Sequence, residues 1–186
     1  MRRIEQEFAS AKPSYRAPSI DDIASIGTRG PWKTKSGGEL NVLFAMPMHT
    51  VNDFLRYETD ELKNYLPRDL RGLRQYHVKN LNIGKVGIGE FHRLRKEMIF
   101  VLEGLIDFEF EDVYGGLERM RLDPGRGVYI PNFILHSYDI KNCSQLVVLA
   151  NTLFDPDDPV THDTYSSETF RKLQHQYLKR NSLTTS

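Results

Sequence analysis

Four titratable side chains in the middle of the chain have types and spacing that suit proton transfer or metal binding. Glu90 and His92 are two positions apart, Glu97 follows closely, and His136 comes later in the sequence. Residues two apart on a strand point to the same face of the sheet. Glu97 and His136 can join them if the sheet closes into a barrel, whose mouth or interior is where ligand sites are expected.

The same four side chains leave three interpretations open. As a metal site, two imidazoles and two carboxylates suit Fe(II), Mn(II), Ni(II) or Zn(II). As acid–base catalysts, the imidazoles accept and donate protons near neutrality. As structural residues, both histidines are core residues with satisfied hydrogen bonds, and Glu97 pairs with a neighbouring cation outside the barrel.

Around these side chains the sequence predicts short strands separated by turns. The segment Ile106–Glu111 alternates apolar and acidic residues, which is the period of a strand with one buried face. Regular short strands with tight turns favour a barrel or sandwich. The predicted strands are Leu73–Leu81, Lys85–Arg93, Glu97–Leu102, Leu105–Glu111, Leu117–Leu122, Gly127–Ile130, Ser137–Ile140 and Gln145–Asn151.

The flanking segments differ from this pattern. Residues 1–38 are polar and broken by proline and glycine, which predicts an N-terminal arm with little structure of its own beyond a short helix over Ile20–Ile26. The barrel is expected over residues 39–166, beginning with a strand at Glu39–Met46 and carrying a helical insertion at about 50–66 with Thr50 as N-cap. Residues 167–186 predict a C-terminal helix and tail, and the polar stretch before them, which includes His162, reads as a surface loop.

Composition excludes several classes of function. The 186 residues include 25 Lys+Arg and 25 Asp+Glu, and this balance argues against a nucleic-acid binder or an anionic-membrane binder. The sequence has neither the roughly 18 consecutive apolar residues of a membrane span nor the apolar core of a secretory signal. The lone Cys143 excludes an intramolecular disulfide and reads as a buried, inert thiol. These features predict a cytoplasmic protein.

Glycines at fixed distances frame the titratable residues. Gly84 and Gly104 bracket Glu90, His92 and Glu97, and the stretch from Gly125 through Pro131 leads to His136. The two stretches resemble the two signature motifs of the cupin superfamily. The resemblance implies an all-β fold, a cupin (RmlC-like jelly-roll β-barrel) with the N-terminal arm and short flanking helices.

Further matches resemble one cupin group, the sugar-nucleotide 3,4-ketoisomerases of the WxcM-like and FdtA/QdtA type. The resemblance covers roughly Leu73 to Leu173, a little over half of the chain. The matching stretches are Leu73–Tyr76, Glu90–His92, Phe100–Gly104, Gly127–Pro131 with His136, Val148–Asn151 with Phe154 and Asp155, and His162–Tyr165 with Phe170.

The resemblance implies roles for individual residues. That family has a His-x-His pair facing the substrate, and its second histidine is the acid–base catalyst; His92 takes that place, and Glu90 stands where the first histidine would be. Its Arg-x-Tyr on the preceding strand matches Arg74 and Tyr76, near the nucleotide or sugar. The expected catalytic residues are His92, Glu90 and Tyr76, and the expected substrate-binding residues are Arg74, His136 and Glu97.

The implied function is isomerisation of a nucleotide sugar. The substrate would be a dTDP- or related NDP-4-keto-6-deoxyhexose in deoxysugar or surface-polysaccharide biosynthesis, the protein would be a homodimer, and no cofactor is favoured. Moving the ketone requires a proton removed beside a carbonyl, an enediol, and a proton returned to the neighbouring carbon, and one histidine can do both steps. An epimerase would share this chemistry. The alternatives are a metal-dependent cupin enzyme, with Glu90, His92, Glu97 and His136 as ligands, and a non-catalytic sugar-nucleotide-binding cupin.

Overall fold

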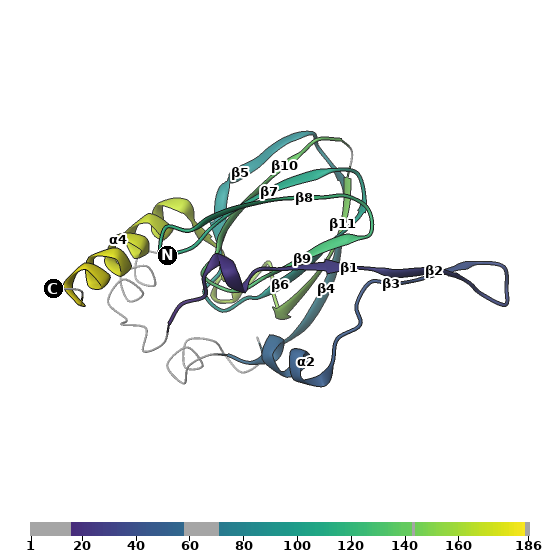
Figure 1. Cartoon of the computed structure of the whole chain (residues 1–186), viewed down its shortest axis with the longest axis horizontal. Coiled ribbons are helices and arrows are strands. Elements are labelled where there is room, and N and C mark those ends of the chain that lie inside the picture. The colour runs from purple at the N-terminus through teal and green to yellow at the C-terminus, as the bar shows by residue number, and fades with distance from the viewer. Residues whose placement is uncertain (1–15, 58–70, 143, 185–186) are drawn as a thin grey trace.

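Two antiparallel sheets of five strands each face one another and form a barrel in the computed structural model, which describes residues 16–57, 71–142 and 144–184 (Figure 1). The first sheet has, in spatial order, β1 (Ala24–Gly27), β9 (Arg126–Ile130), β6 (Glu97–Glu103), β11 (Ser144–Thr152) and β4 (Arg71–Leu81). The second has β12 (Tyr165–Ser166), β5 (Gly84–Phe91), β10 (Leu135–Ile140), β7 (Ile106–Glu111) and β8 (Leu117–Leu122). This architecture confirms the predicted all-β jelly-roll barrel.

The main core fills the space between the two sheets. Along β7, Ile106, Phe108 and Phe110 are buried, whereas the three acidic residues between and after them are only partly buried. The apolar side chains pack inside the barrel against Ile99 and Val101 of the facing sheet. The alternation read from the sequence therefore gives the correct buried face.

Strand β6 is buried on both of its faces. Ile99 and Val101 point into the barrel, while Met98 and Phe100 pack outside it against Phe54. Phe54 belongs to the helix α2 (Met48–Leu55), which covers this side of the sheet. A strand covered on both faces reads as a continuous apolar run rather than as an alternation.

Helix α2 (Met48–Leu55) is the described part of the helical insertion expected at about 50–66. It starts after Pro47, so Thr50 lies inside the helix and is not its N-cap, and it ends at Leu55, where side chains from other segments bind the last carbonyls. Lys96 Nζ donates to the carbonyls of Asp53 (2.8 Å) and Arg56 (3.1 Å), and Asn151 Nδ2 donates to the carbonyl of Phe54 (3.0 Å). The later part of the expected helix and Cys143 lie outside the described residues.

The described part of the N-terminal arm is more structured than expected. Ala24–Gly27 forms β1, an edge strand that pairs with β9, and the helix expected over Ile20–Ile26 is limited to the single 3₁₀ turn η1 (Ile20–Asp22). The chain then makes a hairpin of β2 (Arg29–Lys33) and β3 (Glu39–Val42), which extends away from the barrel (Figure 1). The strand expected over Glu39–Met46 therefore stops at Val42.

The expected C-terminal helix is present as α4 (Ser167–Thr184), after a 3₁₀ turn, η3 (Pro159–Thr161). Phe170 and Leu173 of α4 are buried and pack against Phe91, at the end of β5. Helix α4 thus lies at one end of the barrel, and the β2–β3 hairpin projects on the opposite side (Figure 1). Among the described residues, no helix combines the length and apolar character that crossing a membrane requires.

Candidate active site

Both sheets contribute to one cluster of titratable side chains inside the barrel. Glu90 lies near the end of β5, opposite His136 on β10, and His92 follows β5 directly. Glu97, the first residue of β6, comes from the other sheet and lies between the two rings. Its Oε2 is 3.6 Å from Nε2 of His92 and 3.8 Å from Nε2 of His136. Closure of the barrel thus brings together the four residues that the motifs singled out.

An irregularity in β5 shapes the approach to this cluster. His136 and Tyr138 of β10 are two residues apart, but their partners on β5, Glu90 and Val86, are four apart, so the extra residues bulge. Gly89 lies in the bulge with φ of 92°, a left-handed conformation that favours glycine. Bulges of this kind bend a strand and redirect its side chains. Here the bulged segment leads directly into Glu90.

The cluster is buried except on one side. The side chains of His92, Glu97 and His136 are 3%, 5% and 2% exposed, whereas that of Glu90 is 48% exposed. Oε1 of Glu90 is 4.0 Å from Nε2 of His92 and 3.9 Å from Nε2 of His136. Glu90 therefore marks the side of the site that faces solvent.

A backbone carbonyl favours one tautomer of each imidazole. Nδ1 of His92 lies 2.7 Å from the carbonyl oxygen of Asp163, and Nδ1 of His136 lies 3.1 Å from that of Ile134. A carbonyl only accepts, so Nδ1 donates in both rings, and Nε2 of each neutral ring keeps its lone pair directed into the cluster. Burial, followed by the neighbouring His92, lowers the pKa of His136, which favours its neutral form.

Glu97 is the ionised centre of the cluster. Burial alone would raise its pKa, but Arg95, His92 and His136 outweigh burial and hold the pKa of this carboxyl well below its usual range. The hydroxyl of Tyr76 donates to Oε1 of Glu97 at 3.1 Å. Burial and then the charge of Glu97 raise the pKa of Tyr76, so its hydroxyl keeps its proton at neutral pH.

Two arginines border the cluster. Arg95 places Nε 3.2 Å from Oε1 of Glu97. Its Nη2 lies against the His92 ring, 2.6 Å from Nε2 and 2.8 Å from Nδ1. Arg74, on the same face of β4 as Tyr76, has its guanidinium 5.1 Å from the Tyr76 ring and 5.2 Å from the Phe154 ring. Burial, and then the charge of Arg95, lower the pKa of Arg74. The two guanidiniums make one side of the site cationic.

The donor set also satisfies the geometric requirements of a metal site. One ligand atom each from Glu90, His92 and His136 lies within 4.8 Å of the others, and Glu97 adds a carboxylate oxygen between the two imidazoles. Both rings donate Nδ1–H to carbonyls, as metal-binding histidines do. The guanidinium of Arg95, however, lies against the His92 ring, close to both of its nitrogens, and puts a positive charge beside the position of a metal. The residues therefore fit a divalent transition metal only if Arg95 moves.

Two residues that sequence reasoning missed belong to this site. Arg95 lies in the charged run Arg93–Glu97, which reads as a solvated surface, although its side chain is only 12% exposed. Asp163 lies in the stretch expected to be a surface loop; His162 is exposed there, but Asp163 is 8% exposed and contacts the loop after His92. The only sequence signal was the match of the stretch His162–Tyr165 to the ketoisomerase group.

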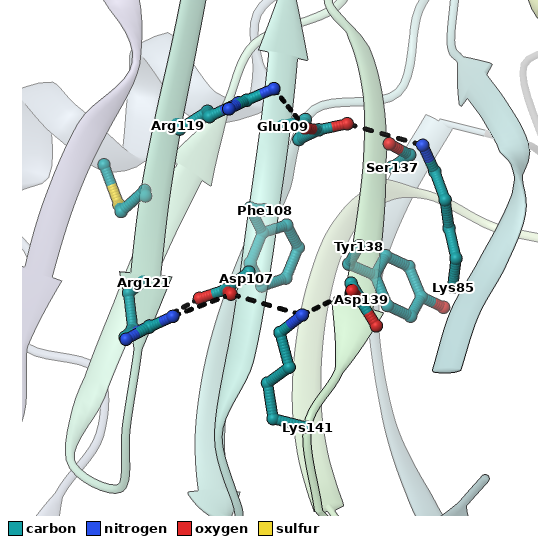
Figure 2. Close-up of a pocket in the computed structure, with 11 residues that line it drawn as sticks. Lys85, Asp107, Phe108, Glu109, Arg119, Arg121, Ser137, Tyr138, Asp139 and Lys141 are labelled. Carbon is teal, nitrogen blue, oxygen red and sulfur yellow. Dashed lines mark hydrogen bonds and ion pairs between the residues drawn. The ribbon is translucent and has the colours of Figure 1, made fainter. Parts of the chain in front are cut away.

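A separate hollow, of about 390 Å³, lies on the outer face of the second sheet (Figure 2). Its charged side chains neutralise one another in ion pairs. Asp107 binds Arg121 at 2.6 Å, and Glu109 binds Arg119 at 2.9 Å. Because this hollow offers paired charges and lies outside the barrel, we place the functional site at the His92 cluster.

Comparison with known proteins shows similarity at the level of structure. No protein-family model matches the chain, and neither does any curated protein. Among solved structures, the TDP-quinovose 3,4-ketoisomerase WlaRB of Campylobacter jejuni is 17% identical, with 82% of this chain and 99% of that chain covered and a TM-score of 0.54. The sugar 3,4-ketoisomerase QdtA of Thermoanaerobacterium thermosaccharolyticum, solved with TDP, is 16% identical, with 85% and 98% covered and a TM-score of 0.54.

An epimerase has the same architecture. The dTDP-6-deoxy-D-glucose-3,5-epimerase RmlC of Legionella pneumophila, solved with dTDP-4-keto-L-rhamnose, is 13% identical, with 79% of this chain and 73% of that chain covered and a TM-score of 0.52. At these identities the likeness concerns the fold. The chain therefore has the RmlC-like cupin fold found in sugar-nucleotide 3,4-ketoisomerases and epimerases.

Proposed function

We propose that this protein is a sugar-nucleotide isomerase, similar to the 3,4-ketoisomerases, that acts on a dTDP- or related NDP-4-keto-6-deoxyhexose. The observation that carries the proposal is the convergence of two Nε2 lone pairs, from His92 and His136, beside an ionised Glu97 inside the barrel. A protonated Tyr76 hydroxyl is bonded to the same carboxylate. The site therefore offers a base and a proton relay within a few ångströms of each other.

The proposed chemistry moves one proton between adjacent carbons. Nε2 of His92 removes the proton from C3, and the C3–H electron pair forms the C3–C4 double bond of an enediolate with its charge on the C4 oxygen. Tyr76, backed by Glu97, relays the hydroxyl proton from the C3 oxygen to the C4 oxygen, with Glu90 as the solvent-side alternative for this role. Protonated His92 then returns its proton to C4, which leaves the ketone at C3. Donors aimed at the developing oxyanion, such as Arg95, lower the barrier.

The arginines suit the charged part of such a substrate. Arg74 is held between the rings of Tyr76 and Phe154, close enough to Arg95 for the two charges to interact. Forked guanidinium donors fit the paired oxygens of a diphosphate. A substrate oxygen that accepts from Arg95 would also release Nε2 of His92, so binding would free the base.

Deuterium incorporation tests the proposal directly. With TDP-4-keto-6-deoxyglucose, the ligand of a solved QdtA variant, in deuterated water, we expect deuterium to enter the ring and signals of the 3-keto isomer to appear in NMR spectra. Exchange at C3 without movement of the ketone would instead indicate an epimerase. Tight binding of the nucleotide sugar without any exchange would contradict catalysis and favour a binding protein.

A metal-dependent enzyme is the second candidate, because the ligand atoms of Glu90, His92 and His136 lie within 4.8 Å of one another. Titration with Co²⁺, followed by visible absorption, separates the two candidates. We expect no stoichiometric binding to the wild-type protein, since the positive charge of Arg95 lies against the His92 ring, 2.6 Å from its Nε2. A 1:1 complex that disappears in a His92→Ala variant would contradict this expectation and favour metal chemistry.

We also propose that the protein is a homodimer. The hairpin β2–β3 has exposed strands and carries Trp32 and Leu40, which are 49% and 50% exposed. An isolated two-stranded hairpin is only marginally stable in water, so packing against a second copy would stabilise it.

A further inference from the structure

The connection between β11 and β12 lies against the loop that carries His92. The carboxylate of Asp163 accepts hydrogen bonds from three consecutive backbone N–H groups, those of Arg93 (3.2 Å), Leu94 (2.7 Å) and Arg95 (2.8 Å). These donors lie in the connection between strands β5 and β6, outside both strands. Because buried N–H groups need a partner, the carboxylate stabilises one conformation of this loop.

The same residue also holds the ring of His92. The backbone carbonyl of Asp163 accepts from Nδ1 of His92 at 2.7 Å, and both residues are buried. One residue thus binds the loop through its side chain and the imidazole through its main chain. The ring cannot turn without breaking the second bond, and Asp163 cannot move without breaking the first three.

We propose that Asp163 is the positioning residue that holds His92 in its Nδ1–H tautomer, with Nε2 directed toward Glu97. The inference rests on the proposed function insofar as His92 is the acid–base catalyst. The other tautomer would present an N–H instead of a lone pair to the substrate and could not remove a proton. Hydrogen bonds to the second ring nitrogen set the tautomer in this way.

A purely structural role for Asp163 makes a different prediction. If the carboxylate only fastened the loop, its removal would lower the stability of the protein but would leave the tautomer of His92 unchanged. If it positions His92, its removal lets the Asp163 carbonyl move, and the ring then populates both tautomers. The tautomer itself is therefore the decisive readout.

The experiment uses full-length protein labelled with ¹⁵N-histidine and two-bond ¹H–¹⁵N correlation spectra, with the His92 signals assigned from a His92→Asn variant. We expect the Nδ1–H tautomer alone in the wild type and a mixture in Asp163→Asn, whose side-chain NH₂ cannot accept. With TDP-4-keto-6-deoxyglucose, kcat of this variant should fall about tenfold to a hundredfold with KM little changed. The control is Asp157→Asn, an exposed carboxylate of the same connection, which should leave the tautomer and kcat unchanged.

Two results would overturn the inference. One is a spectrum of the wild type that shows the Nε2–H tautomer at His92, a result that can be obtained without any variant. The other is a folded Asp163→Asn variant that retains the single Nδ1–H tautomer. If Asp163→Asn does not fold, Asp163→Ser, which keeps a short acceptor, takes its place. Failure of the proposed function can be distinguished from failure of this inference. If the proposed function is wrong, the wild type will not convert the sugar, but the tautomer of His92 can still be measured.

Discussion

Replacing His92 by asparagine should lower the rate of deuterium incorporation from solvent about 10²- to 10⁴-fold, the usual contribution of a general base. The asparagine amide can still donate to the carbonyl of Asp163, as Nδ1 of His92 does, so the loop should keep its conformation. What the substitution removes is Nε2, the atom proposed to take the proton. The rate is measured by NMR with TDP-4-keto-6-deoxyglucose, and binding of TDP is measured separately by calorimetry.

The matched control is His77→Asn. His77 is an exposed histidine on β4 that contacts Gln145, and its loss should leave exchange and binding unchanged. TDP affinity should also be nearly the same in His92→Asn as in the wild type. Exchange at an undiminished rate in that variant would show that His92 is not the base and would direct attention to His136, the second ring with a free lone pair.

Replacing Glu97 by glutamine should destabilise the protein at neutral pH by about 3–5 kcal/mol, because it leaves the side chain of Arg95 in the barrel without its counter-charge. The free energy of unfolding is obtained from urea denaturation. Glu109→Gln is the matched control: Glu109 also contacts two cations, Arg119 and Lys85, but on the outer face of the sheet. Exposed pairs contribute little, so that variant should lose at most about 1 kcal/mol.

The difference in the free energy of unfolding between the wild type and Glu97→Gln should also depend on pH, which provides a second check on the charge of Glu97. The folded protein depresses the pKa of Glu97 below its usual value of 4.5. The stabilisation is therefore fully present above about pH 4.5 and is lost as the pH falls toward the folded-state pKa. The gap between wild type and Glu97→Gln should narrow on acidification, because a protonated Glu97 is as uncharged as glutamine. A gap that stays constant with pH would mean that the charge of Glu97 does not contribute.

The strands that carry the site could be predicted because their sequence patterns are local, and the structure has the buried faces that these patterns indicate. Ile106–Glu111 alternates and has one buried face, and the spacing of Glu90 and His92 places both at one end of β5. Their meeting with Glu97 and His136 followed from barrel closure, a property of the whole fold that the motifs imply.

Contacts between loops could not be predicted from the sequence. Asp163 bonds to the segment after His92 across about 70 residues of chain, and neither loop has a period that relates the two. Arg95 lies in a charged run whose burial depends on these contacts. Strand β1 was missed for another reason: at the edge of the sheet it is largely exposed, so no buried face marks it in the sequence.

The position of Trp32 on the projecting hairpin determines which part of the protein its intrinsic fluorescence monitors. The chain contains one tryptophan, Trp32, which is half exposed and belongs to β2. Figure 1 shows that strand projecting from the barrel. Intrinsic fluorescence of this protein is therefore a probe of the hairpin rather than of the His92 cluster. A spectrum that shifts to the blue as protein concentration rises would record a second copy covering the indole, whereas occupancy of the barrel interior must be followed by another signal.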